Sequence, residues 1–231
     1  LEAGPDLIAI DGGSTDSGPY YLGTGTSKYS RSATKGDWAE LMVARATAGV
    51  PLLIGTAGTC GSDTAVDWML DITLEIARER GEHLKIATMK SGQDRSQVKA
   101  ALDKGRITAL DGAPAIDGPI VEDCTNIVAL AGIEQIQAAL DTEADIIIAG
   151  RATDTAVIAA LPVARGCHRG AAWHGAKVAE CGALATTNPN SGVILMTFDE
   201  TGFVIEPMTD DAAATPHTVS AHMLYENADP F

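Results

Sequence analysis

Three segments of the chain place polar and charged side chains directly after short apolar runs. They are residues 11–16, 55–63 and 150–155. If the apolar runs are parallel strands of an open α/β sheet, all three segments lie at the carboxyl edge of that sheet, where such folds bind their ligands. The spacing therefore predicts one shared site, assembled from loops that are far apart in the sequence.

The first segment reads DGGSTD and combines two acids with flexible backbone. Glycine allows positive φ and close approach of the backbone to a ligand, so four residues are predicted to bind substrate: Gly12, Gly13, Ser14 and Thr15. Asp16 is a candidate catalytic residue, and Asp11 and Asp16 could also act as base or hold a metal ion. The alternative is a glycine-rich turn whose Asp and Ser side chains bond their own backbone.

The second segment, GTAGTCGSD, leads into the clearest helical pattern of the chain. A strand, a glycine-rich loop and a helix N-terminus together can cradle an anion, so Gly58, Thr59 and Cys60 are predicted substrate-binding residues. The glycines match neither the dinucleotide fingerprint nor the P-loop. Cys60 is a candidate nucleophile, because a helix N-terminus can lower a thiol pKa, although an inert buried thiol is the commoner case.

The third segment, GRATDT, follows an unbroken isoleucine run. Arg151 could clamp a carboxylate or phosphate through two parallel hydrogen bonds, and Asp154 could serve as general base. The alternative is a capped helix start, with Thr153 or Asp154 as N-cap and Arg151 paired to Asp154. Both interpretations remain open at this stage.

A fourth motif, AWHGAKVAECGA, lies in a segment with a helical pattern. His174, Lys177 and Cys181 share one helix face, and Lys177 neighbours Glu180. His174 and Lys177 are therefore candidate acid–base residues. The alternative is a surface histidine beside an ordinary Lys–Glu pair.

These motifs need a scaffold, and the hydrophobic periodicity supplies one. Strands are expected at residues 7–10, 50–54, 84–89, 127–130 and 144–149, and helices at 37–48, 63–80, 91–104, 133–140 and 170–184. The alternation predicts an α/β fold with an open, mostly parallel, doubly wound sheet and helices on both faces. A β-hairpin (193–198 and 203–208) and a last helix (219–227) should follow. We expect residues 1–190 to form the ligand-binding domain and 191–231 a subdomain or interface.

Composition excludes several classes of protein. The chain has 231 residues, of which 45% are hydrophobic, and a net charge of −15, which disfavours nucleic acid and anionic membranes as partners. Four irregularly spaced cysteines indicate reduced thiols and a cytoplasmic location. No apolar run is long enough for a membrane span, and no Cys/His cluster or zinc motif predicts a bound metal.

Five blocks of the sequence together resemble one family. They are DGGSTDSGPYYLG, IGTAGTCGSD, IIIAGRATDTAVIAALP, AWHGAKVAECGA and HMLYENADPF, and in this order they are similar to the acyclic terpene utilisation (AtuA-like) family of bacterial proteins. The resemblance implies a role in the breakdown of acyclic terpenes such as citronellol, through acyl-CoA or small carboxylate intermediates. Family members continue past the last block, so a remainder is expected either as a separate chain or as a lost part.

The combined prediction is an enzyme of small-carboxylate or acyl-CoA catabolism. It would be a lyase, hydratase or isomerase that abstracts a proton next to a carbonyl, with Asp154 or His174 as base and Lys177 stabilising the enolate. The cofactor is unknown, and a CoA thioester is a candidate substrate. The expected partners are a small anionic substrate and either a homo-oligomer or a second chain. Alternatives are a non-catalytic CoA- or nucleotide-binding subunit and a hydrolase using Ser14 or Cys60.

Overall fold

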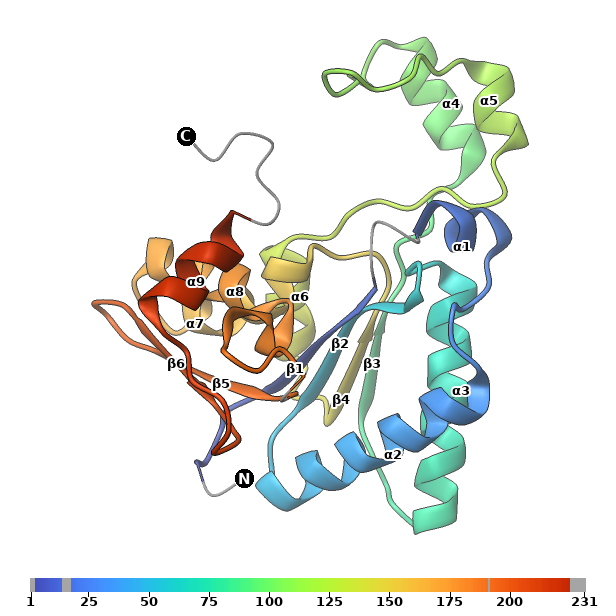
Figure 1. Cartoon of the computed structure of the whole chain (residues 1–231). Coiled ribbons are helices and arrows are strands. Elements are labelled where there is room, and N and C mark those ends of the chain that lie inside the picture. Colours follow the sequence, from blue (N-terminus) through green and yellow to red (C-terminus); the bar gives the residue numbers. More distant parts are fainter. Residues whose placement is uncertain (1–2, 14–17, 191, 225–231) are drawn as a thin grey trace.

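A computed structural model describes residues 3–13, 18–190 and 192–224 of the chain (Figure 1). Its centre is a sheet of four parallel strands in the order β1-β2-β4-β3. The strands are β1 (Ile8–Gly13), β2 (Leu52–Thr59), β3 (Ile86–Met89) and β4 (Ile146–Ala149). The predicted doubly wound α/β class is confirmed.

Alternate residues of the central strands feed two separate cores. Ile146 and Ile148 face α2 (Arg31–Ala48) and α3 (Asp63–Arg80), whereas Ile147 faces α6 (Ile133–Leu140) and α7 (Asp154–Ala164). Strands buried on both faces read as continuous apolar runs, which explains the isoleucine run of β4. Helix α3 follows β2 on one face and α7 follows β4 on the other, so the topological switch point lies between these two neighbouring strands.

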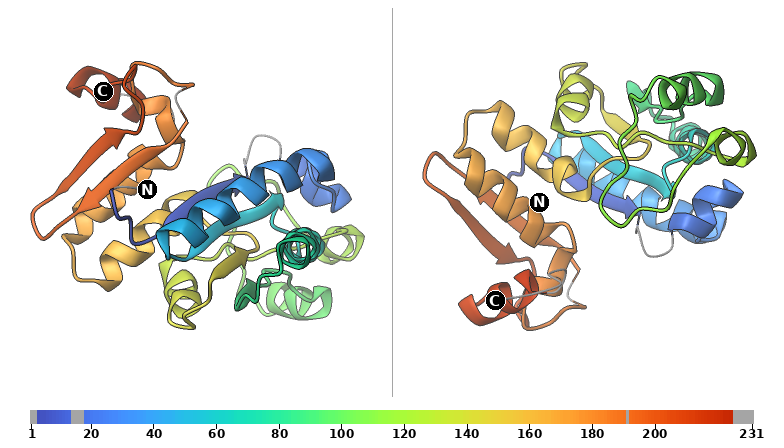
Figure 2. Two further views of the ribbon diagram at one scale, coloured as in Figure 1. Left: turned by 90° about the horizontal axis from the view of Figure 1, so that it is seen from below. Right: turned by 90° about the horizontal axis from the view of Figure 1, so that it is seen from above.

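The C-terminal part packs on α8 (Arg169–Ala179) and not on the sheet. Strands β5 (Ile194–Phe198) and β6 (Phe203–Pro207) form the predicted antiparallel hairpin, and the 3-10 helix Gly182–Ala185 and α9 (Pro216–Met223) lie beside it. Gly175 of α8 lets the two hairpin phenylalanines approach, because a Cβ there would lie 2.6 Å from Phe198. Figure 2 shows the hairpin at the opposite end of the molecule from α4 (Arg95–Asp103) and α5 (Gly118–Asp123).

Several expected boundaries are wrong. Residues 127–130 form no strand and contribute only an isolated bridge at Val128, because the chain there runs out to α5 and back. Strand β2 continues to Thr59 through the expected loop. The expected helix at 63–80 is confirmed as α3: the Ser62 hydroxyl caps its start by accepting from Ala65 N, and Gly81 ends it with a left-handed C-cap.

Other helices differ from expectation in length. Helix α2 begins at Arg31, α4 is shorter than residues 91–104, and α8 ends at Ala179. Short helices α1 (Gly18–Thr24) and α5 occupy segments expected to be loops. Helix α9 covers 216–223, and the remainder of the expected last helix, from residue 225, lies outside the described residues. Among the described helices, none combines the length and the apolar character that a membrane span requires.

Candidate functional site at the carboxyl edge of the sheet

Asp11 lies near the carboxyl end of β1, the edge strand of the sheet. Ile8 and Ile10 pack toward α2 and α3, and Ala9 packs toward α7, so alternation directs the Asp11 side chain to the α7 face. Its carboxylate accepts a hydrogen bond of 3.0 Å from Gly13 N. The register with β2 shifts between Asp11 and Gly13, which marks a bulge at this point.

The electrostatic surroundings of Asp11 favour its protonated form. Burial is the largest cause and raises the pKa of the Asp11 carboxyl to about 7, against the opposing hydrogen bond from Gly13. The charges of Asp154 and Glu180 raise this pKa further, and Arg151 lowers it. A carboxyl that titrates near neutrality can both accept and return a proton at physiological pH.

Arg151 and the start of α7 face the same region. The Arg151 guanidinium makes no hydrogen bond and no ion pair with the part of the chain that the structure describes, and it acts on Asp11 through its charge. Thr153 occupies the N-cap position of α7 without a capping bond, and its hydroxyl is buried with no partner among the described residues. A cation beside an uncapped helix N-terminus is a suitable environment for an anionic ligand group.

Helix α8 contributes a buried carboxylate to this region. The side chain of Glu180 is only 5% exposed; it forms an ion pair of 2.5 Å with Lys177 and accepts a hydrogen bond of 2.5 Å from Thr155. The expected Lys177–Glu180 pair is therefore present, and it fastens the end of α8 to the start of α7. The charges of Arg151, Asp154 and Glu180 thus all act on the Asp11 carboxyl at the end of β1.

The end of β2 is filled by protein backbone. The Thr56 hydroxyl donates to Ala152 O at 3.1 Å and accepts from Ala152 N at 3.3 Å, and Arg151 N donates to Gly61 O at 3.0 Å. A Cβ on Gly61 would lie 2.4 Å from Arg151 N. At the switch point between β2 and β4, the ends of the two strands are therefore held together by direct contacts between protein groups.

Two threonines of β2 adopt strained backbone conformations. Thr56 and Thr59 have φ of 46° and 77°, in the left-handed region that β-branched residues rarely enter. Both are buried, and Thr59 Oγ1 accepts from Lys28 N at 3.3 Å. Such strain persists only where the surroundings fix it, and it clusters near functional sites. The Thr56 contacts hold the β4–α7 loop, and with it Arg151, in place.

The glycines predicted to bind substrate lie where neighbouring elements pack closely. A Cβ on Gly12 would lie 2.6 Å from Gly55 O, one on Gly13 2.3 Å from Thr56 Cγ2, and one on Gly58 2.8 Å from Ala65 Cβ. Each glycine therefore brings β1, β2 or α3 nearer to a neighbouring element than a larger residue would allow. This packing gives no support to a ligand role for their backbone.

Cys60 and Asp63 also have structural contacts. The Cys60 thiol is fully buried and donates to Ser62 Oγ at 3.4 Å, so this conformation gives no support to a nucleophilic Cys60. The Asp63 carboxylate accepts from Ser91 N at 3.1 Å and Gly92 N at 2.8 Å, which ties the start of α3 to the loop after β3.

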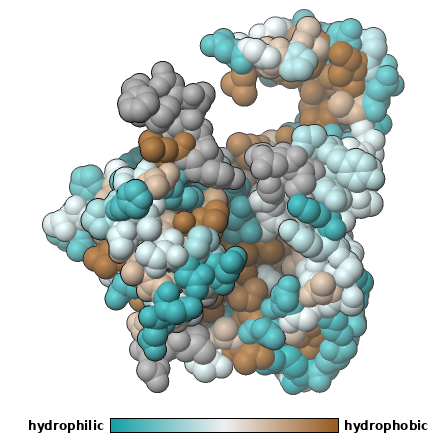
Figure 3. Space-filling model, in the orientation of Figure 1, coloured by the Kyte–Doolittle hydropathy of each residue, from teal (hydrophilic) through white to brown (hydrophobic). Residues whose placement is uncertain are grey.

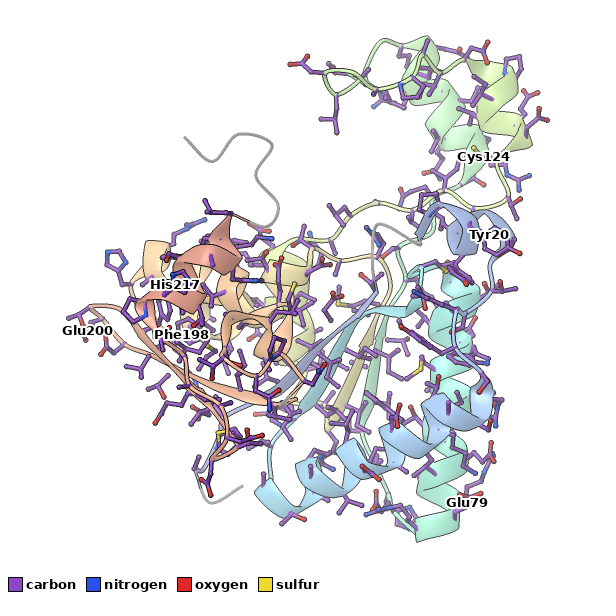
Figure 4. The ribbon with its side chains drawn as sticks, viewed as in Figure 1. Tyr20, Glu79, Cys124, Phe198, Glu200 and His217 are labelled. Carbon is purple, nitrogen blue, oxygen red and sulfur yellow. The ribbon has the colours of Figure 1, made fainter. Side chains whose placement is uncertain are left out.

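The remaining predicted residues pack on the hairpin or lie outside the described residues. The His174 ring packs edge-on against Phe203 of the hairpin at 5.3 Å between centroids. In Figure 4, Phe198 marks the hairpin, and Cys124 marks the base of the α4–α5 projection on the other side of the molecule. Ser14, Thr15 and Asp16 lie outside the described residues. Within the described ranges, no three His, Cys, Asp or Glu side chains are placed to hold a metal ion.

Sequence reasoning underrated three residues of the site. The sequence indicates a Lys177–Glu180 pair but not the burial of Glu180, because this burial depends on how α7 and α8 pack. Asp11 is named from the sequence as a possible base or metal ligand and not as the catalytic residue. Thr56 gave no signal at all, because its positive φ is set by tertiary contacts; the glycines on either side at Gly55 and Gly58 were the only indication of unusual backbone.

Comparison with known proteins identifies a family. No curated protein and no solved structure matches the chain. A family model described as acyclic terpene utilisation family protein AtuA matches residues 53–231, from the start of β2 through Arg151, Lys177 and Glu180, but not β1 with Asp11. Because the match covers well over half of the sequence, the chain belongs to this AtuA family.

Proposed function

We propose that the chain is an enzyme of acyclic-terpene catabolism that abstracts a proton next to the carbonyl of a small carboxylate or CoA thioester. Family membership supports the pathway, since the family is named for acyclic terpene utilisation. The observation that carries the chemistry is the half-buried Asp11 carboxyl, which projects from the carboxyl end of β1 toward Asp154, Glu180 and the Arg151 guanidinium.

Asp11 is the general base in this proposal. A base must lose its proton near the working pH and must regain it in the return step, and a carboxyl with a pKa of about 7 can do both. The positive charge of Arg151 attracts the carboxylate or thioester oxygen, on which negative charge develops as the enolate forms. Asp154 and Glu180 keep the pKa of Asp11 high, which makes it a stronger base once ionised.

This assignment changes the roles expected from sequence. Asp154 becomes a residue that tunes Asp11, and Lys177 acts through its ion pair with Glu180. His174 has no part in the proposal because it packs on the hairpin. The type of reaction that follows deprotonation, whether elimination, hydration or isomerisation, is set by the substrate.

Deuterium exchange tests the proposal without knowledge of the product. Small carboxylates and CoA thioesters with an acidic α-hydrogen are incubated with the protein in deuterium oxide, and incorporation is followed by mass spectrometry. Asp11→Asn should slow exchange by about 10²–10⁴-fold, the usual contribution of a general base, and Arg151→Ala should weaken substrate binding. The matched control is Asp103→Asn, an exposed acid on α4. Exchange at an unchanged rate in Asp11→Asn would overturn the proposal.

A further inference from the structure

A second feature of this edge of the sheet is an apolar pocket on the opposite face of β1. It lies between α2, α3 and the ends of β1 and β2, and its volume is about 260 Å³. Its walls include Trp38 and Leu41 from α2, Trp68 and Met69 from α3, and Ile54 from β2. Figure 3 shows hydrophobic residues in the hollow at the centre of this face of the molecule.

The chemistry of the walls selects an uncharged ligand. Among the described residues that line the pocket there is no Lys, Arg or His. The acidic residues of the lining are Asp37 and Asp11, and the Asp11 carboxyl is directed to the other face of β1. The indole N–H of Trp38 already donates to Thr73 Oγ1 at 2.9 Å, so this group is not available to a ligand. Such walls disfavour phosphate or carboxylate and favour a hydrocarbon chain, whose burial removes apolar surface from water.

The pocket reaches the candidate site. Asp11 and Gly12 belong to its lining, and β1 is the edge strand, with no described strand on its outer side. A hydrocarbon ligand that extends from the pocket over the outer edge of β1 passes Gly12, which has no side chain. It then meets the Asp11 carboxyl on the other face of the strand. The volume corresponds to on the order of eight groups the size of a water molecule or methylene.

We infer that this pocket binds the uncharged hydrocarbon part of the substrate and thereby positions the reacting carbon at Asp11. The link to Asp11 rests on the proposed function, but binding in the pocket does not. Leu41 and Trp68 then determine which chain lengths and branches fit, because they form the walls of the pocket.

Tryptophan NMR locates the ligand directly. The chain has three tryptophans: Trp38 and Trp68 line the pocket, and Trp173 lies on α8. Titration of the full chain with citronellol, an uncharged branched alcohol, should shift the indole N–H resonances of Trp38 and Trp68 in a saturable manner and leave Trp173 unchanged. A saturable shift confined to Trp173, or no saturable shift, would overturn the inference.

A pair of leucine variants tests the wall itself. Leu41→Phe fills the pocket and should weaken citronellol binding by about tenfold or more, whereas Leu74→Phe on the exposed side of α3 should leave it unchanged. Equal binding by the wild type and Leu41→Phe would contradict the assignment.

Saturable binding at Trp38 and Trp68 without deuterium exchange for any substrate would support the pocket and overturn the proposed function. Exchange that depends on Asp11 but is unaffected by Leu41→Phe would support the function and overturn the pocket.

Discussion

Asp11 and Asp63 stand at the carboxyl ends of neighbouring strands, in loops of similar composition, yet their surroundings differ. Asp63 accepts two backbone hydrogen bonds, from Ser91 and Gly92, and has Lys90 beside it, whose ammonium donates to Asp63 O. Asp11 accepts one bond from Gly13 and faces the charges of Asp154 and Glu180. Backbone donors stabilise a carboxylate, whereas burial and neighbouring acids favour the protonated form.

The difference extends to the whole ends of the two strands. At the end of β2, the backbones of Gly61 and Arg151 are in direct contact, and Thr56 is bonded to Ala152. In this region, polar groups of the strand ends bond to one another. At the end of β1, a half-buried acid feels the charge of the Arg151 guanidinium, which has no ion pair with the described residues, and an apolar pocket lies on the other face of the strand. A glycine-rich loop at a strand end thus indicates a site only where its polar groups are not already used by the protein.

The largest expected effect tests the packed end of β2. Gly61→Ala places a methyl group 2.4 Å from Arg151 N at a residue with φ of 65°, and we expect it to lower the free energy of unfolding by about 3 kcal/mol or more. The control is Gly81→Ala, which has φ of 66° but nothing within 4 Å of the added Cβ and should cost about 1 kcal/mol. Urea unfolding measures both, and equal losses would show that the contact is not tight.

A smaller effect is expected at Asp63. Asp63→Ala removes the acceptor for Ser91 N and Gly92 N and should lower the free energy of unfolding by about 2 kcal/mol. Asp67→Ala, on the same helix, removes only an exposed ion pair with Lys90 and should cost about 0.5 kcal/mol or less. Similar losses of stability for both variants in thermal denaturation would show that the Asp63 hydrogen bonds stabilise the fold no more than an exposed ion pair does.

The smallest effect concerns the pH dependence of stability at Asp11. The unfolded carboxyl titrates near pH 3.9 and the folded one near pH 7, so between these values the folded protein retains a proton that the unfolded chain has lost. Stability therefore falls as pH rises through this window. Asp11→Asn removes this cost. The stability of the variant relative to the wild type should therefore be greater at pH 8 than at pH 4, by on the order of 1–2 kcal/mol. The exposed control Asp103→Asn should show no such trend in urea unfolding at the two pH values.

Periodicity predicted the parallel sheet, its two helical faces and the hairpin, because buried strands and amphipathic helices leave local patterns. The pattern of residues 127–130 was misleading, since a short apolar run also suits an extended segment that crosses the surface. Open α/β sheets bind ligands at the carboxyl ends of their strands, and this rule predicted that the residues after β1 and β4 would lie at the same edge of the sheet. The roles of Glu180 and Thr56 depend on contacts between distant elements and could not be predicted from spacing.

The most direct test of the central claim is a carboxyl-carbon NMR titration of Asp11, assigned by the loss of its signal in Asp11→Asn. We expect a midpoint near pH 7 in the wild type, and a lower midpoint in Glu180→Gln because a neighbouring negative charge is removed. A wild-type midpoint near pH 4, the ordinary value for an aspartate, would contradict the assignment of Asp11 as the general base.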